Sequence, residues 1–255
     1  MLVCQISDLH VRAPGLISYG VVDCAAMVAP CVAEVLRLPQ RPEVVVITGD
    51  LTDLGRPEEY AHLRKLLEPL PMPVYLLPGN HDDREQLRAS FADHAYLRQW
   101  PPYVQYAIEE WPLRLVAIDT VVPGEPGGRL CAERLGWLER TLAAAPQKPT
   151  LLLMHHPPFA TLIGHMDGMG LEDPRQLESI IRKNPQVERV LCGHLHRPIQ
   201  ARFGGTIAST CPRIIATTGQ VMWERLARAI GAAALLQRPE FETSGARLKN
   251  RDALN

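Results

Sequence analysis

The sequence predicts an α/β protein built around buried sheets. Short apolar runs rich in β-branched residues recur along the chain, as expected for buried strands. Segments with helical spacing of apolar residues lie between these runs, and proline-rich connectors at 39–42, 69–73 and 146–149 end the helices before the next strand. The resulting β-α-β-α-β order favours an α/β core.

Six apolar runs are predicted as strands: Leu2–Ile6, Val44–Thr48, Val74–Leu77, Leu113–Asp119, Thr150–Met154 and Val187–Cys192. The segment Tyr103–Ile108 alternates loosely and precedes Leu113–Ile118, so these two are expected to pair antiparallel and make the sheet mixed. A late strand is expected over Phe203–Ala208.

Five segments between the strands are predicted as helices: Val21–Leu36, Pro57–Leu67, Asp83–Phe91, Ala132–Ala145 and Pro174–Lys183. The second has the clearest start. Pro57 stands at an N1-like position, and Glu58 and Glu59 place negative charge in the first turn, where the helix dipole favours it.

Bulk properties indicate a globular protein of 255 residues, one large domain or one domain with a small appendage. The formal net charge of −1 argues against a surface that coats nucleic acid or attracts a membrane, so neither partner is expected. No apolar run approaches the roughly 18 residues of a membrane span. The first residues resemble a strand rather than a signal peptide, so a cytoplasmic location is expected.

The cysteines are scattered and lack C-x-x-C spacing, which favours reduced thiols over disulfides or a redox site. Cys4 and Cys192 fall within apolar strand runs and are expected to act as small buried hydrophobes.

Polar motifs stand where predicted strands end. They are Asp8-Leu9-His10, Gly49-Asp50, Gly79-Asn80-His81-Asp82, His155-His156 and Gly193-His194-Leu195-His196. Carboxylate, carboxamide and imidazole groups at the tips of several strands can converge on one point, which is how a two-metal hydrolytic site is built. Five such motifs in one structural context argue against coincidence.

The first two motifs supply carboxylates. Asp8 and His10 would point the same way in an extended segment and reach one cation, although a turn aspartate and a surface histidine explain this pair equally well. Asp50 has two oxygens that can bridge two cations, and an Asx-turn is the simpler alternative. Asp53 is expected to be structural or to support a ligand.

The third motif combines a weak ligand with a group suited to substrate. The Asn80 carboxamide suits a cation that must exchange water for substrate. His81 could donate to a phosphate oxygen or protonate a leaving alkoxide. Asp82 either orients His81 or caps the next helix.

The last two motifs supply imidazoles. Adjacent residues of an extended chain face opposite ways, so His155 is expected to be the ligand and His156 to support the loop. His194 and His196 repeat the two-residue spacing. Nitrogen and oxygen donors without thiolate favour Mn²⁺, Fe²⁺, Co²⁺ or Zn²⁺ over a cysteine-type zinc site.

The motifs D-x-H, G-D-x-x-D, G-N-H-D, H-H-P-P and G-H-x-H resemble the calcineurin-like metallophosphoesterase superfamily, over Met1 to about Pro212. Within it, the short spacing from Leu9 to Val44 and the segments 154–159 and 164–171 look most like GpdQ-type glycerophosphodiesterases and class III cyclic-nucleotide phosphodiesterases. The resemblance implies a four-layer α/β/β/α sandwich with two mixed sheets.

The resemblance also implies a ligand set. One cation would be held by Asp8, His10, Asp50 and His196, and a second by Asp50, Asn80, His155 and His194, with Asp50 bridging. Asn80 and His81 would contact substrate and assist catalysis. His165 and Met166 would line the leaving-group side or, as an equal alternative, begin a helix.

The implied activity is metal-dependent hydrolysis of small phosphodiesters, such as glycerophosphodiesters and dialkyl or aryl diesters, by a metal-activated water or hydroxide. A cyclic-nucleotide (cAMP) phosphodiesterase is the main alternative, for which Tyr19 and Phe159 are the nearby candidates to stack on a base. A stable nucleic-acid complex is not expected. A metal-free interaction scaffold on the same fold is the remote alternative.

The resemblance ends after Cys211-Pro212, which divides the chain into a catalytic domain over 1–212 and an atypical helix and tail over 213–255. A helix is predicted over Val221–Leu236, with Leu226 and Ile230 on one apolar face that suits docking or a homo-oligomer. The alternative is a tail that arose by frameshift or gene fusion.

Overall fold

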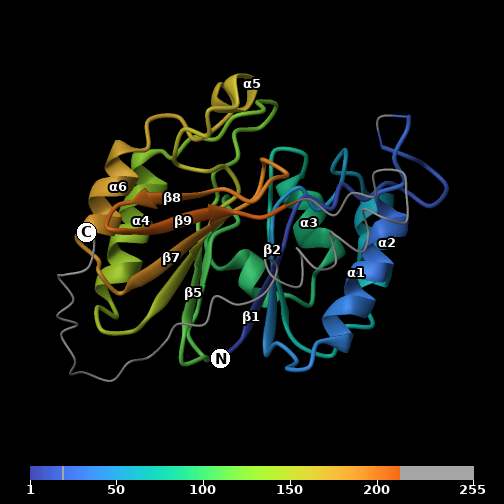
Figure 1. The fold of residues 1–255 in the computed structure, drawn as a ribbon, viewed down its shortest axis with the longest axis horizontal. Helices are drawn as coiled ribbons and strands as arrows, with labels where there is room; N and C mark the ends of the chain where they lie inside the picture. Colours follow the sequence, from blue (N-terminus) through green and yellow to red (C-terminus); the bar gives the residue numbers. More distant parts are fainter. Residues whose placement is uncertain (19, 213–255) are drawn as a thin grey trace, which may run out of the picture.

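Two β-sheets pack face to face in the computed structural model, which describes residues 1–18 and 20–212 (Figure 1). A three-stranded sheet has the order β1-β2-β3, and a six-stranded sheet has the order β4-β5-β6-β7-β9-β8. The strands are β1 (Val3–Ile6), β2 (Val44–Thr48), β3 (Val74–Leu77), β4 (Tyr106–Ile108), β5 (Arg114–Ala117), β6 (Thr150–Leu153), β7 (Val187–Cys192), β8 (Gln200–Phe203) and β9 (Thr206–Thr210).

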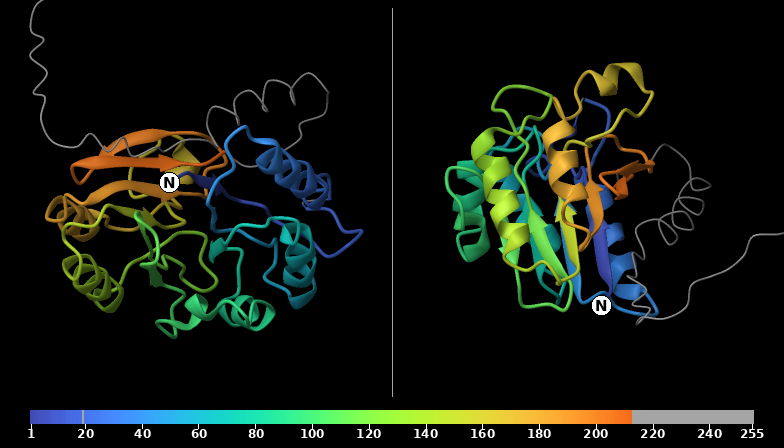
Figure 2. Two further views of the ribbon diagram at one scale, coloured as in Figure 1. Left: turned by 90° about the horizontal axis from the view of Figure 1, so that it is seen from below. Right: turned by 90° about the vertical axis from the view of Figure 1, so that its left-hand side faces the viewer.

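Helices cover the outer face of each sheet, which gives the four layers α/β/β/α (Figure 2). The helices are α1 (Ala25–Arg37), α2 (Pro57–Leu67), α3 (Arg84–Ser90), α4 (Ala132–Ala143), α5 (Gly164–Asp167) and α6 (Arg175–Arg182), with a 3₁₀ turn at Ala95–Arg98. Helices α1 to α3 contribute to the apolar cluster on the three-stranded sheet, and α4 and α6 to the cluster on the six-stranded sheet. None of the described helices is long and apolar enough to cross a membrane.

The pleat of β2 shows why its sequence is apolar throughout. Val44 and Val46 belong to the cluster between the two sheets, whereas Val45 and Ile47 belong to the cluster under the helices. Each burial removes an aliphatic side chain from water, which contributes about 1.5–3 kcal/mol as an upper estimate. A strand buried on both faces cannot alternate apolar and polar residues.

The predicted strands are confirmed, with two corrections to the sheets. The six-stranded sheet is mixed, because β4 pairs antiparallel with β5 and β8 with β9, but the described strands of the other sheet are all parallel. The single strand expected over Phe203–Ala208 is wrong. Gly204 and Gly205 adopt positive φ and turn the chain, so this segment is the tip of a β8–β9 hairpin.

The predicted helices occur in place, and α2 begins at Pro57 with both glutamates in its first turn. Helix α1 begins at Ala25 rather than Val21, because the Asp23 carboxylate accepts from the Ala26 amide and fixes a later start. Cys4 and Cys192 are buried, as expected, and all six cysteines are free thiols. The helix predicted over Val221–Leu236 lies outside the described residues.

Candidate metal centre

All seven predicted ligands follow strands that end at one edge of the two sheets. Because β1, β2 and β3 are mutually parallel, as are β5, β6 and β7, the carboxyl ends of neighbouring strands lie side by side. The structure brings the side chains of these ligands together there: Asp8, His10, Asp50, Asn80, His155, His194 and His196.

One group of donors joins the loops after β1, β2 and β7. His10 Nε2 lies 3.2 Å from His196 Nε2 and 3.4 Å from Asp50 Oδ2. His196 Nε2 lies 3.6 Å from Asp8 Oδ1. These four residues also meet the geometric requirement for a common cation, since their donor atoms all lie within 4.8 Å of one another.

A second group joins the loops after β2, β3, β6 and β7. The Asn80 carboxamide oxygen lies 3.1 Å from His155 Nε2 and 3.1 Å from His194 Nδ1. His155 Nε2 lies 3.4 Å from Asp50 Oδ1. Asp50 therefore directs one carboxylate oxygen to each group, which is the geometry of a carboxylate that bridges two cations.

The backbone at these positions is left-handed. Asp8, His10, Asp50, His194 and His196 have φ of 58°, 44°, 49°, 73° and 56°. Such conformations of non-glycine residues cost of order 1–3 kcal/mol each and cluster at functional sites. The expectation that an extended segment aligns Asp8 with His10 is therefore wrong, because both residues leave the strand conformation and converge through positive φ.

Glycines make room for this convergence. A Cβ on Gly79 would lie 2.2 Å from Asp50 Oδ1 and 2.3 Å from the Asp50 amide nitrogen. A Cβ on Gly49 would lie 2.3 Å from His155 Nδ1, and one on Gly193 would lie 2.3 Å from Ser7 Oγ. The glycines of the motifs thus permit side chains from different loops to meet.

The charges of the site fit cations. Asp8 and Asp50 are both buried, and Asp8 Oδ2 has no hydrogen-bond partner in the described part of the chain. Burial raises the pKa of Asp8 to about 7. Burial also opposes ionisation of Asp50, yet His155 and His10 hold its pKa well below the usual range. Buried carboxylates need positive charge, and cations would supply it.

The spacing and identity of the donors fit as well. Nitrogen and oxygen ligands sit about 2.0–2.2 Å from a tetrahedral cation, which places neighbouring donors roughly 3.3–3.5 Å apart. The contacts around Asp50 have this spacing. Burial opposes a charge on His155, but Asp50 and Asp8 outweigh it and raise the pKa of His155 to about 9. Burial together with the charge on His155 lowers the pKa of His194 to about 3. A ligating histidine must be neutral, so a bound cation would take the place of the His155 proton.

His81 is placed to act on a substrate. Its Nδ1 donates to the backbone oxygen of Asp53 over 2.8 Å, which leaves Nε2 as the nitrogen that a substrate can contact. Its amide donates to Asp50 Oδ1 over 3.0 Å, and its half-buried ring lies 4.5 Å from the His10 ring.

Asp53 supports the site from behind. Its Oδ1 lies 3.5 Å from His10 Nδ1, the ring nitrogen opposite the donor atom, and its Oδ2 accepts from Arg12 over 2.9 Å. This contact fixes the orientation of the His10 ring. The sequence gives no signal for this role of Arg12 beyond its place two residues after His10.

Both roles expected for Asp82 are wrong. Its carboxylate accepts from the amides of Leu51, Thr52 and Gly79, and so ties the loop after β2 to the loop after β3. Asp83 caps α3 instead, because its side chain accepts from the Gln86 amide.

His156 supports its loop as expected. Its Nδ1 lies 2.7 Å from Thr120 Oγ1 and its Nε2 lies 3.2 Å from the Pro126 oxygen. Sequence patterns give no sign of Thr120, which is remote in the chain. His165 lies in the first turn of α5 and is exposed, which agrees with the alternative that it begins a helix. Among the described residues, no contact joins His165 to the donors of the candidate metal centre.

Of the two aromatic residues considered for base stacking, the structure describes only Phe159. Phe159 is half-buried and packs against the apolar cluster of the six-stranded sheet, which occupies its ring. Tyr19 lies outside the described residues.

Comparisons with known proteins agree with this geometry. The calcineurin-like phosphoesterase family model matches residues 1–198, and the chain belongs to that family. The chain is 36% identical over 222 residues to the glycerophosphodiester phosphodiesterase GpdQ of Enterobacter lignolyticus, covering 84% of this chain and 78% of that protein. It is 32% identical over 185 residues to the 3',5'-cyclic adenosine monophosphate phosphodiesterase CpdA of Escherichia coli K12, covering 71% and 66%.

A solved dimetal phosphatase from Danio rerio has the same fold, with a TM-score of 0.68 at 17% identity, covering 86% of this chain and 89% of that one. The expected superfamily and four-layer sandwich are thus confirmed, apart from the parallel sheet noted above.

Proposed function

We propose that this chain is a dinuclear metal-dependent phosphodiesterase that hydrolyses small phosphodiesters, including glycerophosphodiesters and dialkyl or aryl diesters. The observation that carries the proposal is the division of the two Asp50 oxygens between two groups of nitrogen and oxygen donors. Similarity to GpdQ proteins supports the glycerophosphodiester class.

Two divalent cations bound there would lower the pKa of a bound water and neutralise charge that develops on the phosphoryl oxygens. Asp8, His10, Asp50 and His196 are proposed to hold one cation, and Asp50, Asn80, His155 and His194 the other. The donor set suits Mn²⁺, Fe²⁺, Co²⁺ or Zn²⁺.

The chain itself contributes orientation and a proton donor. The Asp53 carbonyl fixes the His81 ring, so that its Nε2 can bind a phosphate oxygen or protonate the leaving alkoxide when it carries a proton. The Asn80 carboxamide, between two imidazoles, is the neutral donor that exchanges most readily for substrate. One phosphate ester bond breaks.

A cyclic-nucleotide phosphodiesterase is the second candidate, favoured by the similarity to CpdA. Rates on 3',5'-cAMP and on glycerophosphoethanolamine, measured with the same metal-loaded protein, separate the two. A larger kcat/KM for cAMP would replace the glycerophosphodiester assignment.

A metal-free scaffold is the remote alternative, and it conflicts with the retention of every donor at the site. We further propose that the enzyme is cytoplasmic and that residues 1–212 form its catalytic unit. We also propose that it is a homo-oligomer, which sedimentation tests. Sedimentation as a monomer at assay concentration would remove the oligomer.

The test of function is the initial rate on bis-p-nitrophenyl phosphate after chelator treatment and addition of Mn²⁺, compared with the rate on p-nitrophenyl phosphate. Diester cleavage that is lost on chelation and restored by the metal is expected. Absence of diester turnover with every divalent metal tried, in protein with a cooperative thermal transition, would overturn the proposal. Failure to bind Mn²⁺ or Zn²⁺ would then favour the scaffold.

A further inference from the structure

Five large apolar side chains are exposed in the described part of the chain. They are Leu16 (49% exposed), Ile17 (45%), Val21 (79%), Leu54 (48%) and Leu162 (93%). Single exposed leucines are ordinary on a protein surface and need no explanation. The distribution of these five is not ordinary, because each lies in a loop that directly follows a ligand motif. We call these five residues the apolar rim.

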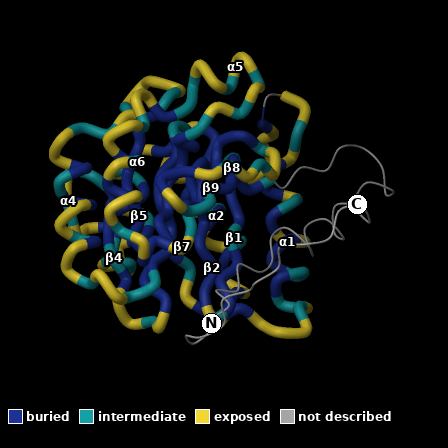
Figure 3. The backbone as a smooth tube through the Cα atoms, turned by 60° about the vertical axis from the view of Figure 1, so that its left-hand side comes forward, coloured by how far each residue is buried: buried dark blue, intermediate teal, exposed yellow. Residues whose placement is uncertain are grey.

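The loops of the apolar rim stand at the edge that holds the candidate metal centre. Figure 1 shows the loop before α1 and the segment leading into α5 on the same side of the molecule, above the ends of the parallel strands. Figure 3 shows exposed backbone in both regions. Leu54 follows Asp50 by four residues, so their Cα atoms lie within about 14 Å of each other.

Leu162 is held in an unfavourable conformation. Its φ is 63°, a left-handed value that is rare for a bulky residue. The Asp167 carboxylate maintains it by accepting from the Leu162 amide over 2.9 Å and from the Thr161 amide and hydroxyl over 2.6 Å each. A strained residue whose apolar side chain projects into water indicates a functional contact.

The loop before α1 is also fixed, and it is fixed to a ligand. The Ser18 amide donates to the Val22 oxygen over 2.7 Å, and the Ser18 hydroxyl donates to the His10 oxygen over 3.0 Å. Val21 is thus held next to Val22, which Ser18 joins to the backbone of His10. Fixed loops lose little entropy when they bind a partner, which favours recognition over random exposure.

We propose that the apolar rim binds the aliphatic ester group of an amphiphilic phosphodiester whose phosphate lies in the metal centre. This inference rests on the proposed function and specifies its substrate class. A buried polar centre, with exposed aliphatic side chains in the loops that follow its ligand motifs, matches a molecule with a charged phosphodiester and an apolar arm. A fully hydrophilic diester would leave the apolar rim in water.

The test is a series of p-nitrophenyl alkyl phosphates with methyl, butyl and octyl groups, assayed with the metal-loaded full chain below micelle-forming concentrations. Each methylene removed from water contributes up to about fourfold to binding, so kcat/KM is expected to rise about tenfold or more from methyl to octyl. A flat or falling series, with clear turnover of the methyl diester, would overturn the inference and leave the proposed function intact. Absence of turnover for all three would overturn both.

Substitutions then locate the contact. Leu162→Ser is expected to reduce the octyl-to-methyl ratio of kcat/KM at least threefold, whereas Leu162→Met, which keeps an apolar side chain of similar size, keeps the ratio. Val21→Ser tests the loop before α1 in the same way. Unchanged ratios in both serine variants would overturn the inference. So would a homodimer that dissociates on Leu162→Ser, because a second copy would then cover the apolar rim.

Discussion

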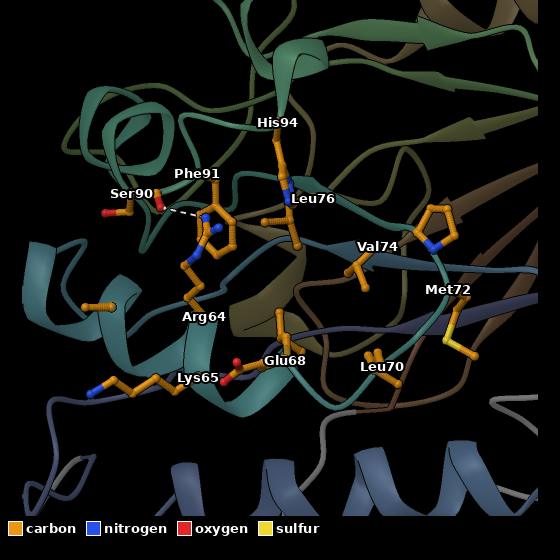
Figure 4. Close-up of a pocket in the computed structure, with 13 residues that line it drawn as sticks. Arg64, Lys65, Glu68, Leu70, Met72, Val74, Leu76, Ser90, Phe91 and His94 are labelled. Atoms are coloured by element: carbon orange, nitrogen blue, oxygen red, sulfur yellow. Dashed lines mark hydrogen bonds between the residues drawn. The ribbon is translucent and has the colours of Figure 1, made fainter.

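The candidate metal centre and the cavity beside α2 and α3 differ in whether their charged groups already have partners within the protein. The cavity holds about 680 Å³ and is lined mainly by apolar side chains, among them Leu70, Val74 and Phe91 (Figure 4). Its principal charged group is already satisfied, since both terminal nitrogens of Arg64 donate to Asp93, over 2.6 and 2.7 Å. The cavity has the volume of a ligand site without convergent donors.

The metal centre shows the opposite pattern. Its donors face one another at 3.1–3.6 Å, and two of its carboxylates are buried. Five of its residues hold a left-handed backbone. Folding has assembled groups that stabilise the chain poorly by themselves, so their arrangement is explained by what they bind. In this protein, buried donor groups that converge on one another identify the candidate functional site better than cavity volume does.

Replacing Asp50 by Asn should have the largest effect, because it removes the carboxylate shared by both donor groups. We expect kcat/KM on bis-p-nitrophenyl phosphate to fall about a thousandfold or more, as loss of one partner of a buried charge cluster costs about 3–5 kcal/mol. Bound metal, measured by elemental analysis, should fall from two equivalents to one or fewer. Two retained equivalents with a rate within tenfold of the parent would refute the bridging role.

Replacing Gly79 by Ala should come next, since the new Cβ would clash with the backbone and carboxylate of Asp50. We expect a loss of about 2–4 kcal/mol in the free energy of unfolding and about a hundredfold in kcat/KM. Gly136→Ala, inside α4 with only the flexible end of Arg140 nearby, is the matched control and should stabilise by about 0.5–1 kcal/mol. Equal effects of the two substitutions would mean that Gly79 does not space the ligands.

Much of this contrast was accessible from sequence. Apolar runs such as Val44–Thr48 predict strands, and a polar motif after each run predicts where side chains meet. The candidate donors are likewise predicted from residue type, because carboxylate, carboxamide and imidazole groups after successive strands suit divalent cations.

The rest depends on contacts that a linear pattern does not contain. Positive φ at Asp8 and His10 is imposed by the neighbouring loops and overrides the alternation expected of a strand. The role of Asp82 depends on Leu51 and Thr52, whose amides approach it only in the folded chain. Gly204-Gly205 is a turn signal for the β8–β9 hairpin. The apolar residues Phe203 and Ile207 near it favour a single strand instead.

Replacing Asp53 by Asn should have an intermediate effect, because Asp53 contacts a ligand rather than serving in the donor groups. Loss of its charge behind His10 is expected to weaken the apparent affinity for Mn²⁺ about 10–100-fold, with a smaller change in kcat at saturating metal. Asp93→Asn removes a carboxylate at the cavity and is the control. A metal affinity unchanged by Asp53→Asn would separate Asp53 from the metal centre.

Replacing Arg64 by Ala should have the smallest effect. Its salt bridge to Asp93 joins side chains that are 47% and 57% exposed, and such pairs contribute about 0–1 kcal/mol. The guanidinium also lies 5.5 Å from the centre of the Phe91 ring, so the variant loses some packing as well. We expect a fall in melting temperature of at most about 4 °C and no change in kcat/KM.

Arg64→Lys sharpens this last comparison, because it keeps the charge and the aliphatic stem but loses the two-pronged bond. If either variant lowered kcat/KM more than twofold at saturating metal, the cavity and the metal centre would be energetically coupled. One route for such coupling is α2, whose Tyr60 hydroxyl donates to Asp82, the residue that ties the loops after β2 and β3 together. Another is β3, which lines the cavity and leads into the loop that holds Asn80. If the two sites are independent, α2 and its contacts with these loops keep one arrangement in both variants. Energetic coupling would require a structural element with two alternative arrangements.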